Sequence, residues 1–286
     1  MDVLMPMRSS DVSVSNMALD DGMGEQSIDP YLIPGIGILR NRVGLTDAAS
    51  LAAAEYALSM GRLLELSQMD VSAQGTVSQL QWIHHYLFQD VYDWAGQLRT
   101  VNIEKGGNLF LPVQMFDTGI PYCEQVLHDD GFLCGMDRKR FIHRLSVNYD
   151  NFNVLHPFRE GNGRAQRFFW DLVARDAGWH FDWRLIGKEE NYSASAQALL
   201  HADHDPLIRM FDKITKPLDE PLEFDYADLV ARVSRYEIPD SQVREYSPQE
   251  YGMLAERYAS FDHQEDPSAS VPPHPAIHRK HQKRHL

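Results

Sequence analysis

The segment from His156 to Arg167, HPFREGNGRAQR, holds residues whose types and spacing suggest chemistry. An imidazole titrates near neutral pH, so His156 is suited to take a proton from an attacking hydroxyl group. Glu160 is out of place in a simple anion site, because a carboxylate repels phosphate. Mg²⁺ prefers a carboxylate, water and phosphate oxygens as ligands, so we expect Glu160 to hold a magnesium ion. The segment therefore predicts a site for phosphate chemistry.

The middle of the segment predicts an anion-binding turn. Gly161, Asn162 and Gly163 all tolerate a positive φ, and successive N–H groups in such a turn form a concave anion site. We expect a helix to begin at about Gly163, whose free N–H donors and positive dipole end add to the same site. Arg164 and Arg167 are three positions apart on the first turn, so we expect them to project to one side. Together these features predict a polyphosphate cradle.

Each part of this segment also has an ordinary structural explanation. A single His-Pro or Gly-Asn-Gly is usually only a turn, and two arginines three apart usually form a solvated face. Their occurrence together at a helix start favours the functional interpretation. Phe158 has no chemical group to offer, so we expect it to point into the core and hold the loop in place.

Helices are expected on both sides of the segment. Asp47 is a suitable N-cap for a helix that extends through Leu63. Apolar residues at three- and four-residue steps predict a second helix that runs to Trp94 and ends at Gly96. Further helices are expected near residues 113–129, 137–152, 163–178, 189–201 and 207–213.

Residues 97–112 have a different pattern. Val101 and Ile103 alternate with polar residues, and the glycine pair at 106–107 interrupts the run, which predicts a short β-hairpin. No other stretch in the first half of the sequence has a convincing strand pattern. The expected fold is all-α, a helical bundle with one short β-hairpin.

Length, composition and charge restrict the class of protein. The 286 residues are 43% hydrophobic and 24% charged, which is typical of a soluble globule. The formal net charge of −14 argues against direct nucleic-acid binding. The 2 cysteines exclude a disulfide-rich scaffold. Neither a secretion signal nor an apolar run of about 20 residues is found, so we expect a cytoplasmic protein without a membrane partner.

The composition predicts four segments along the chain. Residues 1–29 form a flexible leader and residues 30–216 the core with its flanking helices. Residues 217–265 are expected to form a C-terminal helical extension, and residues 266–286, rich in proline and then basic, a disordered tail.

The segment 156–167 resembles the signature of the Fic (filamentation induced by cAMP) family, HxFx(D/E)GNGRxxR, and every defined position matches. Residues 79–112 resemble the family's helix and active-site hairpin, called the flap. Residues 31–41 resemble the segment that opens many bacterial Fic proteins. The resemblance covers roughly residues 30–215 and implies a Fic-type helical bundle with a flap.

The resemblance also implies an activity. Fic proteins mostly transfer AMP from ATP to a hydroxyl group of a protein and release pyrophosphate, which would make this chain a nucleotidyltransferase. On this resemblance His156 is the general base and Glu160 holds Mg²⁺ between the α- and β-phosphates. The residues implied to bind the nucleotide are Lys105, Gly106, Arg159, Gly161, Asn162, Gly163, Arg164, Arg167 and Tyr192.

Several of these residues have simpler alternatives. Lys105 is equally well explained as a solvated hairpin lysine, and Tyr192, expected near the adenine, as a helix-surface tyrosine. His84 lies on the apolar side of its helix and is expected to be a packed core histidine. His201 and His204 are three apart, but a helix end explains them better than a metal site does.

The resemblance implies two protein partners. A target is expected to dock on the flap, about residues 102–111, by strand addition. Many Fic proteins are inhibited by a helix carrying (S/T)xxxE(G/N), whose glutamate pairs with the second arginine of the signature. Thr100–Glu104 and Ser241–Glu245 have the first part of this pattern, but neither is followed by Gly or Asn. We therefore expect a toxin whose small antitoxin supplies a glutamate opposite Arg167, with Ser241–Glu245 as a weaker internal alternative.

Two other functions stay open. The chain could be a Fic enzyme that uses another nucleotide or phospho-donor, although its intact Gly-Asn-Gly-Arg favours AMP transfer. It could also be a non-catalytic nucleotide-binding adaptor, which would need neither His156 nor Glu160. The basic pairs Arg279-Lys280 and Lys283-Arg284 suggest export into a host cell as the alternative location.

Overall fold

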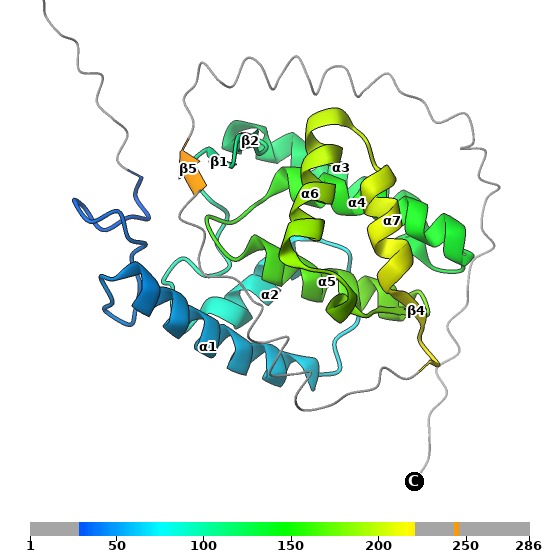
Figure 1. The fold of residues 1–286 in the computed structure, drawn as a ribbon, viewed down its shortest axis with the longest axis horizontal. Helices are drawn as coiled ribbons and strands as arrows, with labels where there is room; N and C mark the ends of the chain where they lie inside the picture. Colours follow the sequence, from blue (N-terminus) through cyan, green and yellow to red (C-terminus); the bar gives the residue numbers. More distant parts are fainter. Residues whose placement is uncertain (1–28, 221–242, 246–286) are drawn as a thin grey trace, which may run out of the picture.

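Seven α-helices make up most of residues 29–220, which the computed structural model describes together with residues 243–245 (Figure 1). The expected all-α bundle is confirmed. The helices are α1 Ala48–Ser67, α2 Val77–Phe88, α3 Phe116–Asp129, α4 Arg138–Leu155, α5 Asn162–Asp176, α6 Lys188–His201 and α7 Asp205–Ile214. Short 3₁₀ turns lie at Val113–Met115, Gly131–Leu133 and Trp183–Leu185.

Side-chain caps explain where the helices begin. The carboxylate of Asp47 accepts from the Ser50 N–H at 2.8 Å, and Asp137 caps α4 in the same way through Arg140 N–H at 2.9 Å. The expected start after Asp47 is confirmed. The expected end of α2 near Trp94 is wrong, because the helix stops at Phe88 and the chain continues through turns. Residues in those turns are also buried, so the apolar spacing continues beyond the helix.

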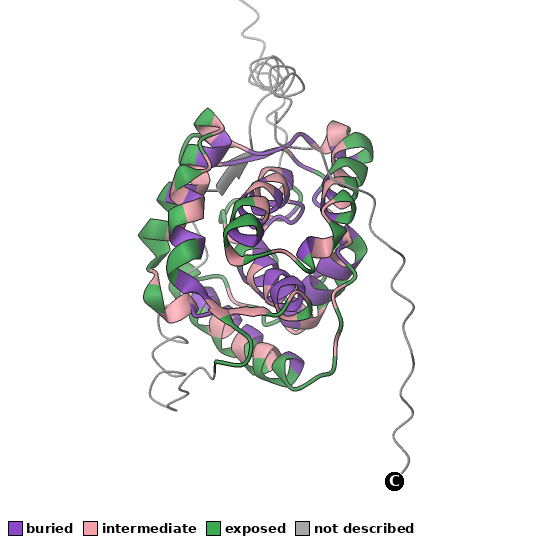
Figure 2. Ribbon diagram, turned by 90° about the vertical axis from the view of Figure 1, so that its right-hand side faces the viewer, coloured by how far each residue is buried: buried purple, intermediate pink, exposed green. Residues whose placement is uncertain are grey.

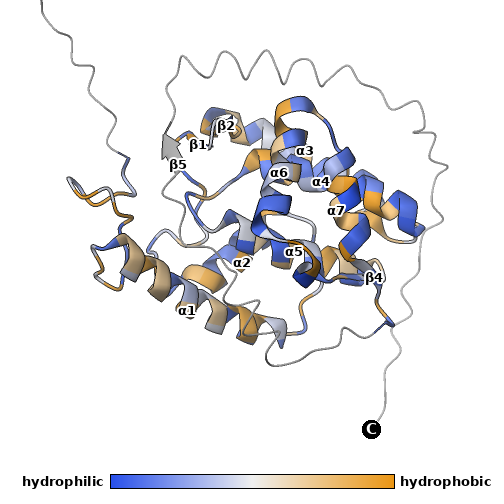
Figure 3. Cartoon of the chain, in the orientation of Figure 1, coloured by the Kyte–Doolittle hydropathy of each residue, from blue (hydrophilic) through white to orange (hydrophobic). Residues whose placement is uncertain are grey.

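Helix α5 lies in the middle of the bundle. It packs on α2, and α2 packs on α1, while α4 packs on α3, α6 and α7 (Figure 1). Trp170 and Phe169 of α5 are fully buried, and both rings contact Phe152 of α4. Figure 2 shows the buried residues on the inward faces of the helices, and Figure 3 shows hydrophilic and hydrophobic residues mixed along most helices, with α1 mainly hydrophobic. The start of α5, which carries the signature segment, is therefore held by the core on both sides.

The flap is the expected β-hairpin. Strand β1 Ile103–Lys105 pairs antiparallel with β2 Asn108–Leu109. On its other side β1 pairs antiparallel with β5 Val243–Glu245, which gives a three-stranded sheet in the order β2-β1-β5 (Figure 1). A second pair, β3 Trp179–Phe181 with β4 Thr215–Pro217, was not predicted.

Most of the predicted leader, 1–29, lies outside the described residues. So do the predicted tail, 266–286, and most of the extension, 217–265. Their assignments stay predictions. None of the helices in the described part of the chain is long and apolar enough to span a membrane.

Candidate active site

His156 lies at the C-terminal end of α4, in the left-handed region at φ 41° and ψ 62°. Proline at the next position disfavours a helical residue before it, so the predicted turn at His156 is confirmed. The imidazole stacks on the Phe110 ring of the flap, with centroids 3.6 Å apart. Its Nδ1 lies 3.2 Å from the carbonyl oxygen of Asn153. Because that oxygen can only accept, Nδ1 carries the hydrogen and Nε2 keeps a lone pair that can take a proton.

The electrostatic surroundings of His156 favour its neutral form. Burial lowers the pKa of the imidazole well below its usual range, and the positive charges of Lys105 and Arg99 lower it further. A histidine with such a pKa is unprotonated at neutral pH. It is therefore present in the form that a general base needs.

The loop after His156 is closed by Asn162. The Asn162 side chain accepts from the Phe158 N–H at 2.9 Å and donates to the Phe158 carbonyl at 2.7 Å. Phe158 is fully buried, as predicted. Gly161 has φ 80°, and a Cβ there would lie 2.5 Å from the Phe88 ring, so the position requires glycine. Of the three residues that tolerate a positive φ, Gly161 adopts one, whereas Asn162 and Gly163 belong to the first turn of α5.

Glu160 faces the cavity from the same loop. Its carboxylate accepts from the Gly161 N–H at 2.9 Å and lies 4.0 Å from the guanidinium of Arg164. Burial raises its pKa, and the neighbouring carboxylate of Glu55 adds to the shift. A cation beside Glu160 would offset this clustering of negative charge.

The position of the Arg164 side chain differs from the one predicted from the sequence. Its guanidinium donates to the carboxylate of Glu55 and to the hydroxyl of Ser59, both on α1, and lies over the Phe88 ring at 4.6 Å. It is buried and does not line the cavity, whereas Arg167 does. The two arginines therefore do not project to one side. A spacing of three positions brings two Cβ atoms close, but it does not fix the direction of the long side chains. The Arg164 side chain points toward α1 because the buried Glu55 carboxylate there needs a partner of opposite charge.

An open cavity connects the signature segment, the flap and α6. With its open mouth it encloses about 870 Å³. Nine of the predicted site residues line it: Lys105, His156, Arg159, Glu160, Gly161, Asn162, Gly163, Arg167 and Tyr192. Other lining residues not predicted from the sequence include Asn108, Phe110, Lys188 and Ser195.

Arg159 lines the cavity, but its guanidinium is used elsewhere. It forms a buried ion pair with Asp29 at 2.9 Å, which ties the beginning of the described chain to the signature loop. The predicted role in nucleotide binding is therefore not supported by its contacts. A structural role for Arg159 fits them better.

The tip of the flap contacts α6 through Tyr192. The Tyr192 hydroxyl accepts from the Asn108 amide at 3.1 Å, and the Lys105 ammonium lies 6.0 Å from the ring centre. Gly106, φ 55°, comes so close that a Cβ there would be 2.3 Å from the Tyr192 hydroxyl. Tyr192 is thus more than a helix-surface tyrosine, since it holds the flap against one wall of the cavity.

Two buried side chains attach the signature loop to its neighbours. Arg99 donates to the carbonyl oxygens of His156 at 2.9 Å and Val101 at 2.7 Å, and also to that of Leu111. His84 is fully buried, as predicted, and its Nε2 lies 2.8 Å from the Glu160 carbonyl oxygen. Burial lowers the His84 pKa to about 3, so this ring stays neutral.

Sequence reasoning did not identify Asp29, Glu55 or Arg99. The sequence pattern around Glu55 could have identified it, because a charged residue there interrupts a face of α1 made mostly of small and apolar residues. In the structure Glu55 is fully buried on that face. A charged residue in such a stripe needs a partner of opposite charge. Asp29 and Arg99 have no comparable local pattern.

The chain is similar to known proteins. A model of the Fic/DOC family matches residues 74–174. The probable protein adenylyltransferase Fic of Escherichia coli (strain K12) is 35% identical over 202 residues, which cover 71% of this chain and 99% of that protein. The chain belongs to the Fic/DOC family.

Other members extend the comparison. Protein adenylyltransferase VbhT of Bartonella schoenbuchensis is 38% identical over 175 residues, 61% of this chain and 36% of that longer protein. A solved N-terminal Fic domain from Bartonella quintana, with bound ADP, has a TM-score of 0.63 and 25% identity. The match covers 65% of this chain and 94% of the chain in that solved structure. The Fic-type bundle with a flap is thus confirmed for this chain.

Proposed function

We propose that this chain is a protein adenylyltransferase that transfers AMP from ATP to a hydroxyl side chain of a target protein and releases pyrophosphate. The observation that carries the proposal is the convergence of His156, Glu160 and Arg167 on one cavity at the start of α5. The names of the relatives from Escherichia coli and Bartonella schoenbuchensis support the same activity. So does the ADP bound to the Fic domain from Bartonella quintana.

In the proposed reaction the target's hydroxyl oxygen attacks the α-phosphorus of ATP. Its proton passes to Nε2 of His156, because Nδ1 donates to the Asn153 carbonyl. The bond from the α-phosphorus to the oxygen that bridges to the β-phosphate breaks, and pyrophosphate leaves. Most of the acceleration would come from alignment and charge neutralisation, as in other phosphoryl-type transfers.

The negative charge of the phosphates has two sources of compensation in this chain. The N-terminal end of α5 presents unpaired N–H groups and the positive end of the helix dipole, beginning at Asn162. Arg167 lines the same end of the cavity and would neutralise the terminal phosphates. Lys105 and Tyr192 line the same cavity and would contact the nucleoside part.

Glu160 would hold magnesium. It lies in the cavity, and burial together with the charge of Glu55 raises its pKa, so a bound cation would stabilise its ionised form. The remaining ligands would be phosphate oxygens and water. When bound, magnesium neutralises the phosphates and orients them.

The test uses two labels and two histidine variants. Purified protein is incubated with a bacterial lysate, magnesium and ATP labelled on either the α- or the γ-phosphate. We expect a labelled protein with the α-label alone, lost in His156→Ala and retained in His143→Ala, since His143 is exposed on the same helix. Labelling from the γ-phosphate would indicate phosphate transfer. Unlabelled lysate with both ATP samples would contradict AMP transfer to its proteins.

Two protein partners complete the proposal. The target would dock on the flap, about residues 102–111, and a small antitoxin would supply a glutamate opposite Arg167. The absence from the sequence of Ser/Thr-x-x-x-Glu followed by Gly or Asn supports an inhibitor on a separate chain. Expression of this protein alone should then arrest growth in an Arg167-dependent way. Normal growth with abundant soluble protein would contradict the toxin assignment.

The proposed site of action is the cytoplasm of the producing cell. Export into a host cell is the alternative, since the Bartonella quintana relative is a VirB-translocated effector protein. Fractionation of cultures would distinguish the two.

A further inference from the structure

Strand β1 of the flap is paired on both edges. One edge carries β2, and the other carries β5, residues Val243–Glu245, in the register Ile103 with Glu245 and Lys105 with Val243 (Figure 1). Strand β2 in turn packs against α6. The edge of β1 that faces away from β2 is therefore where an extended segment can be added to the hairpin, and a segment of this same chain is paired there.

The hydrogen-bonding direction along β1 follows from one contact. The Phe110 N–H donates to the Ile103 carbonyl at 3.2 Å, so the main-chain groups of Ile103 face β2. In an antiparallel pair successive residues alternate in direction, so the N–H and carbonyl of Glu104 face β5. Arg244 lies opposite Glu104 in the register. The main-chain groups of Arg244 thus point toward β1, and those of Glu245 point away.

We propose that Val243–Glu245 is an intramolecular occupant of the strand-docking edge of the flap and excludes any other added strand until it is displaced. This inference rests on the proposed function in one respect: the excluded strand belongs to the target. It gives the Ser241–Glu245 segment a different role from the one its sequence suggested. The segment would act by occupying β1 through its main chain, whereas the helical motif acts through a glutamate opposite Arg167.

The covalent connection makes such a short pairing effective. A three-residue strand is weak as a separate peptide. A tethered segment, however, competes at a local concentration that for short linkers is on the order of millimolar. A target must therefore present a longer or better-matched strand, or bring other contacts, to take its place. Main-chain pairing accepts strands of many sequences. Because a target strand must first displace Val243–Glu245, fewer target strands would bind to β1.

The first test measures occupancy by hydrogen exchange in the full-length protein. Arg244→Pro removes the N–H that faces β1, whereas Glu245→Pro removes one that faces away, which makes it a matched control. We expect exchange of the flap peptide containing Glu104 to rise roughly tenfold in Arg244→Pro and to stay unchanged in Glu245→Pro and in Arg244→Ala. Equal exchange in all four proteins would overturn the proposal.

The second test measures exclusion. A fluorescent synthetic peptide of residues 240–247 is titrated into wild-type protein and into both proline variants. Tighter binding by about tenfold to Arg244→Pro alone is expected, because its edge is open. Equal affinity for all three proteins would mean that the segment excludes nothing, and would overturn the proposal. Neither test requires catalysis, so failure of AMP transfer in the lysate assay would refute the proposed function without altering these results.

Discussion

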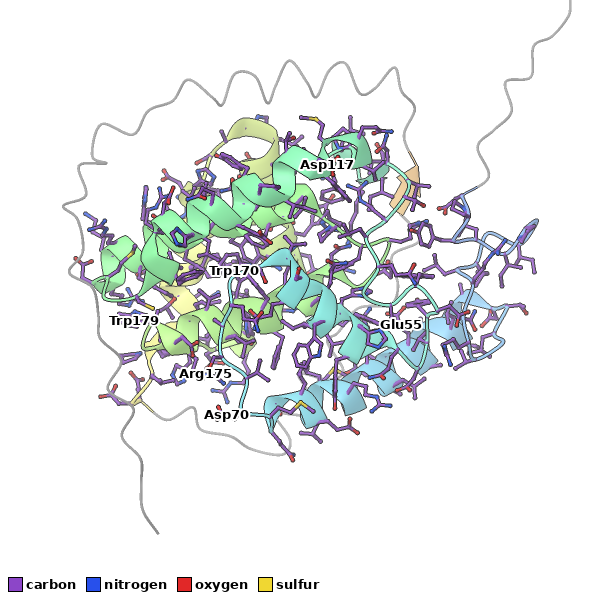
Figure 4. All side chains as sticks on the ribbon, turned by 180° about the vertical axis from the view of Figure 1, so that it is seen from behind. Glu55, Asp70, Asp117, Trp170, Arg175 and Trp179 are labelled. Carbon is purple, nitrogen blue, oxygen red and sulfur yellow. The ribbon has the colours of Figure 1, made fainter. Side chains whose placement is uncertain are left out.

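The guanidinium of Arg164 on α5 donates to the buried carboxylate of Glu55 on α1. Figure 4 labels Glu55 among the side chains of the bundle. The Tyr92 hydroxyl donates to the same carboxylate, and Glu160 lies 4.0 Å from Arg164. One arginine of the signature is thus held by a helix that lies outside the family-matched residues 74–174. Glu55 keeps Arg164 on the α1 side, so Glu160 remains available to the cavity.

Glu55→Gln should therefore be strongly destabilising. It leaves the Arg164 charge buried with only Glu160 nearby, and removing one partner of a buried ion pair costs about 3–5 kcal/mol. Urea unfolding followed by circular dichroism measures the loss. Glu65→Gln is the control, because Glu65 lies on the same helix in an exposed pair with Arg62, where about 0–1 kcal/mol is expected. Similar losses in the two variants would contradict the assignment of Glu55.

Gly106→Ala should weaken nucleotide binding through the Tyr192 hydroxyl, which a Cβ would approach to 2.3 Å. Gly107→Ala is the control, since it also has a positive φ but nothing within 4 Å of its Cβ. Both variants carry backbone strain of about 1 kcal/mol, but only Gly106→Ala displaces Tyr192. Adding Tyr192→Phe removes the clashing atom and should restore affinity toward that of Tyr192→Phe alone. Fluorescent ATP titration provides the measurement, and absence of rescue would refute the clash.

Arg159 and Arg167 should respond differently to the same substitution. Arg159→Gln breaks the buried pair with Asp29 and should lower the free energy of unfolding by about 3 kcal/mol. Arg167 lies in the cavity wall, and Arg167→Gln should reduce the thermal shift produced by ATP and magnesium. The reverse pattern in a thermal-shift titration would exchange the roles assigned to the two residues.

His156 should titrate well below pH 6.5. Burial is the main cause, with Lys105 and Arg99 adding to it. Because the pKa is lowered, the ring loses its proton at a more acidic pH, and the base form is already populated throughout the range above 6.5. NMR of the ring C–H groups gives the midpoint, and Lys105→Met should raise it. A midpoint at or above 6.5 would contradict the neutral-base assignment.

Local patterns were enough to predict the helices and the position of the signature segment. The Asp47 cap, the Pro157 turn and the glycine pair of the flap each act over a few residues, so they can be recognised without a fold. The end of α2 was missed for a related reason. Residues such as Val91 and Trp94 are buried in turns, and their spacing imitates that of a helix.

The parts that could not be predicted depend on distant residues. Glu55 and Arg164 are 109 positions apart, and Asp29 and Arg159 are 130 apart. No spacing rule connects such pairs, and each holds the guanidinium of an arginine that was predicted to bind the nucleotide. The pairings of β3 with β4 and of β5 with β1 were missed because three-residue strands carry too little alternation to detect.

If a target docks on the flap as proposed, Arg99 influences which of its residues is modified. It binds carbonyl oxygens at both ends of the flap hairpin, Val101 and Leu111, and the carbonyl of His156 itself. If the flap moves, His156 moves with it. The distance between a strand paired with the flap and the His156 imidazole therefore stays constant. The modified hydroxyl would then be chosen by how many residues separate it from the docked strand. Lengthening that connection in a target by one residue should shift the modification along the chain or abolish it, even when every side chain that touches the enzyme is unchanged.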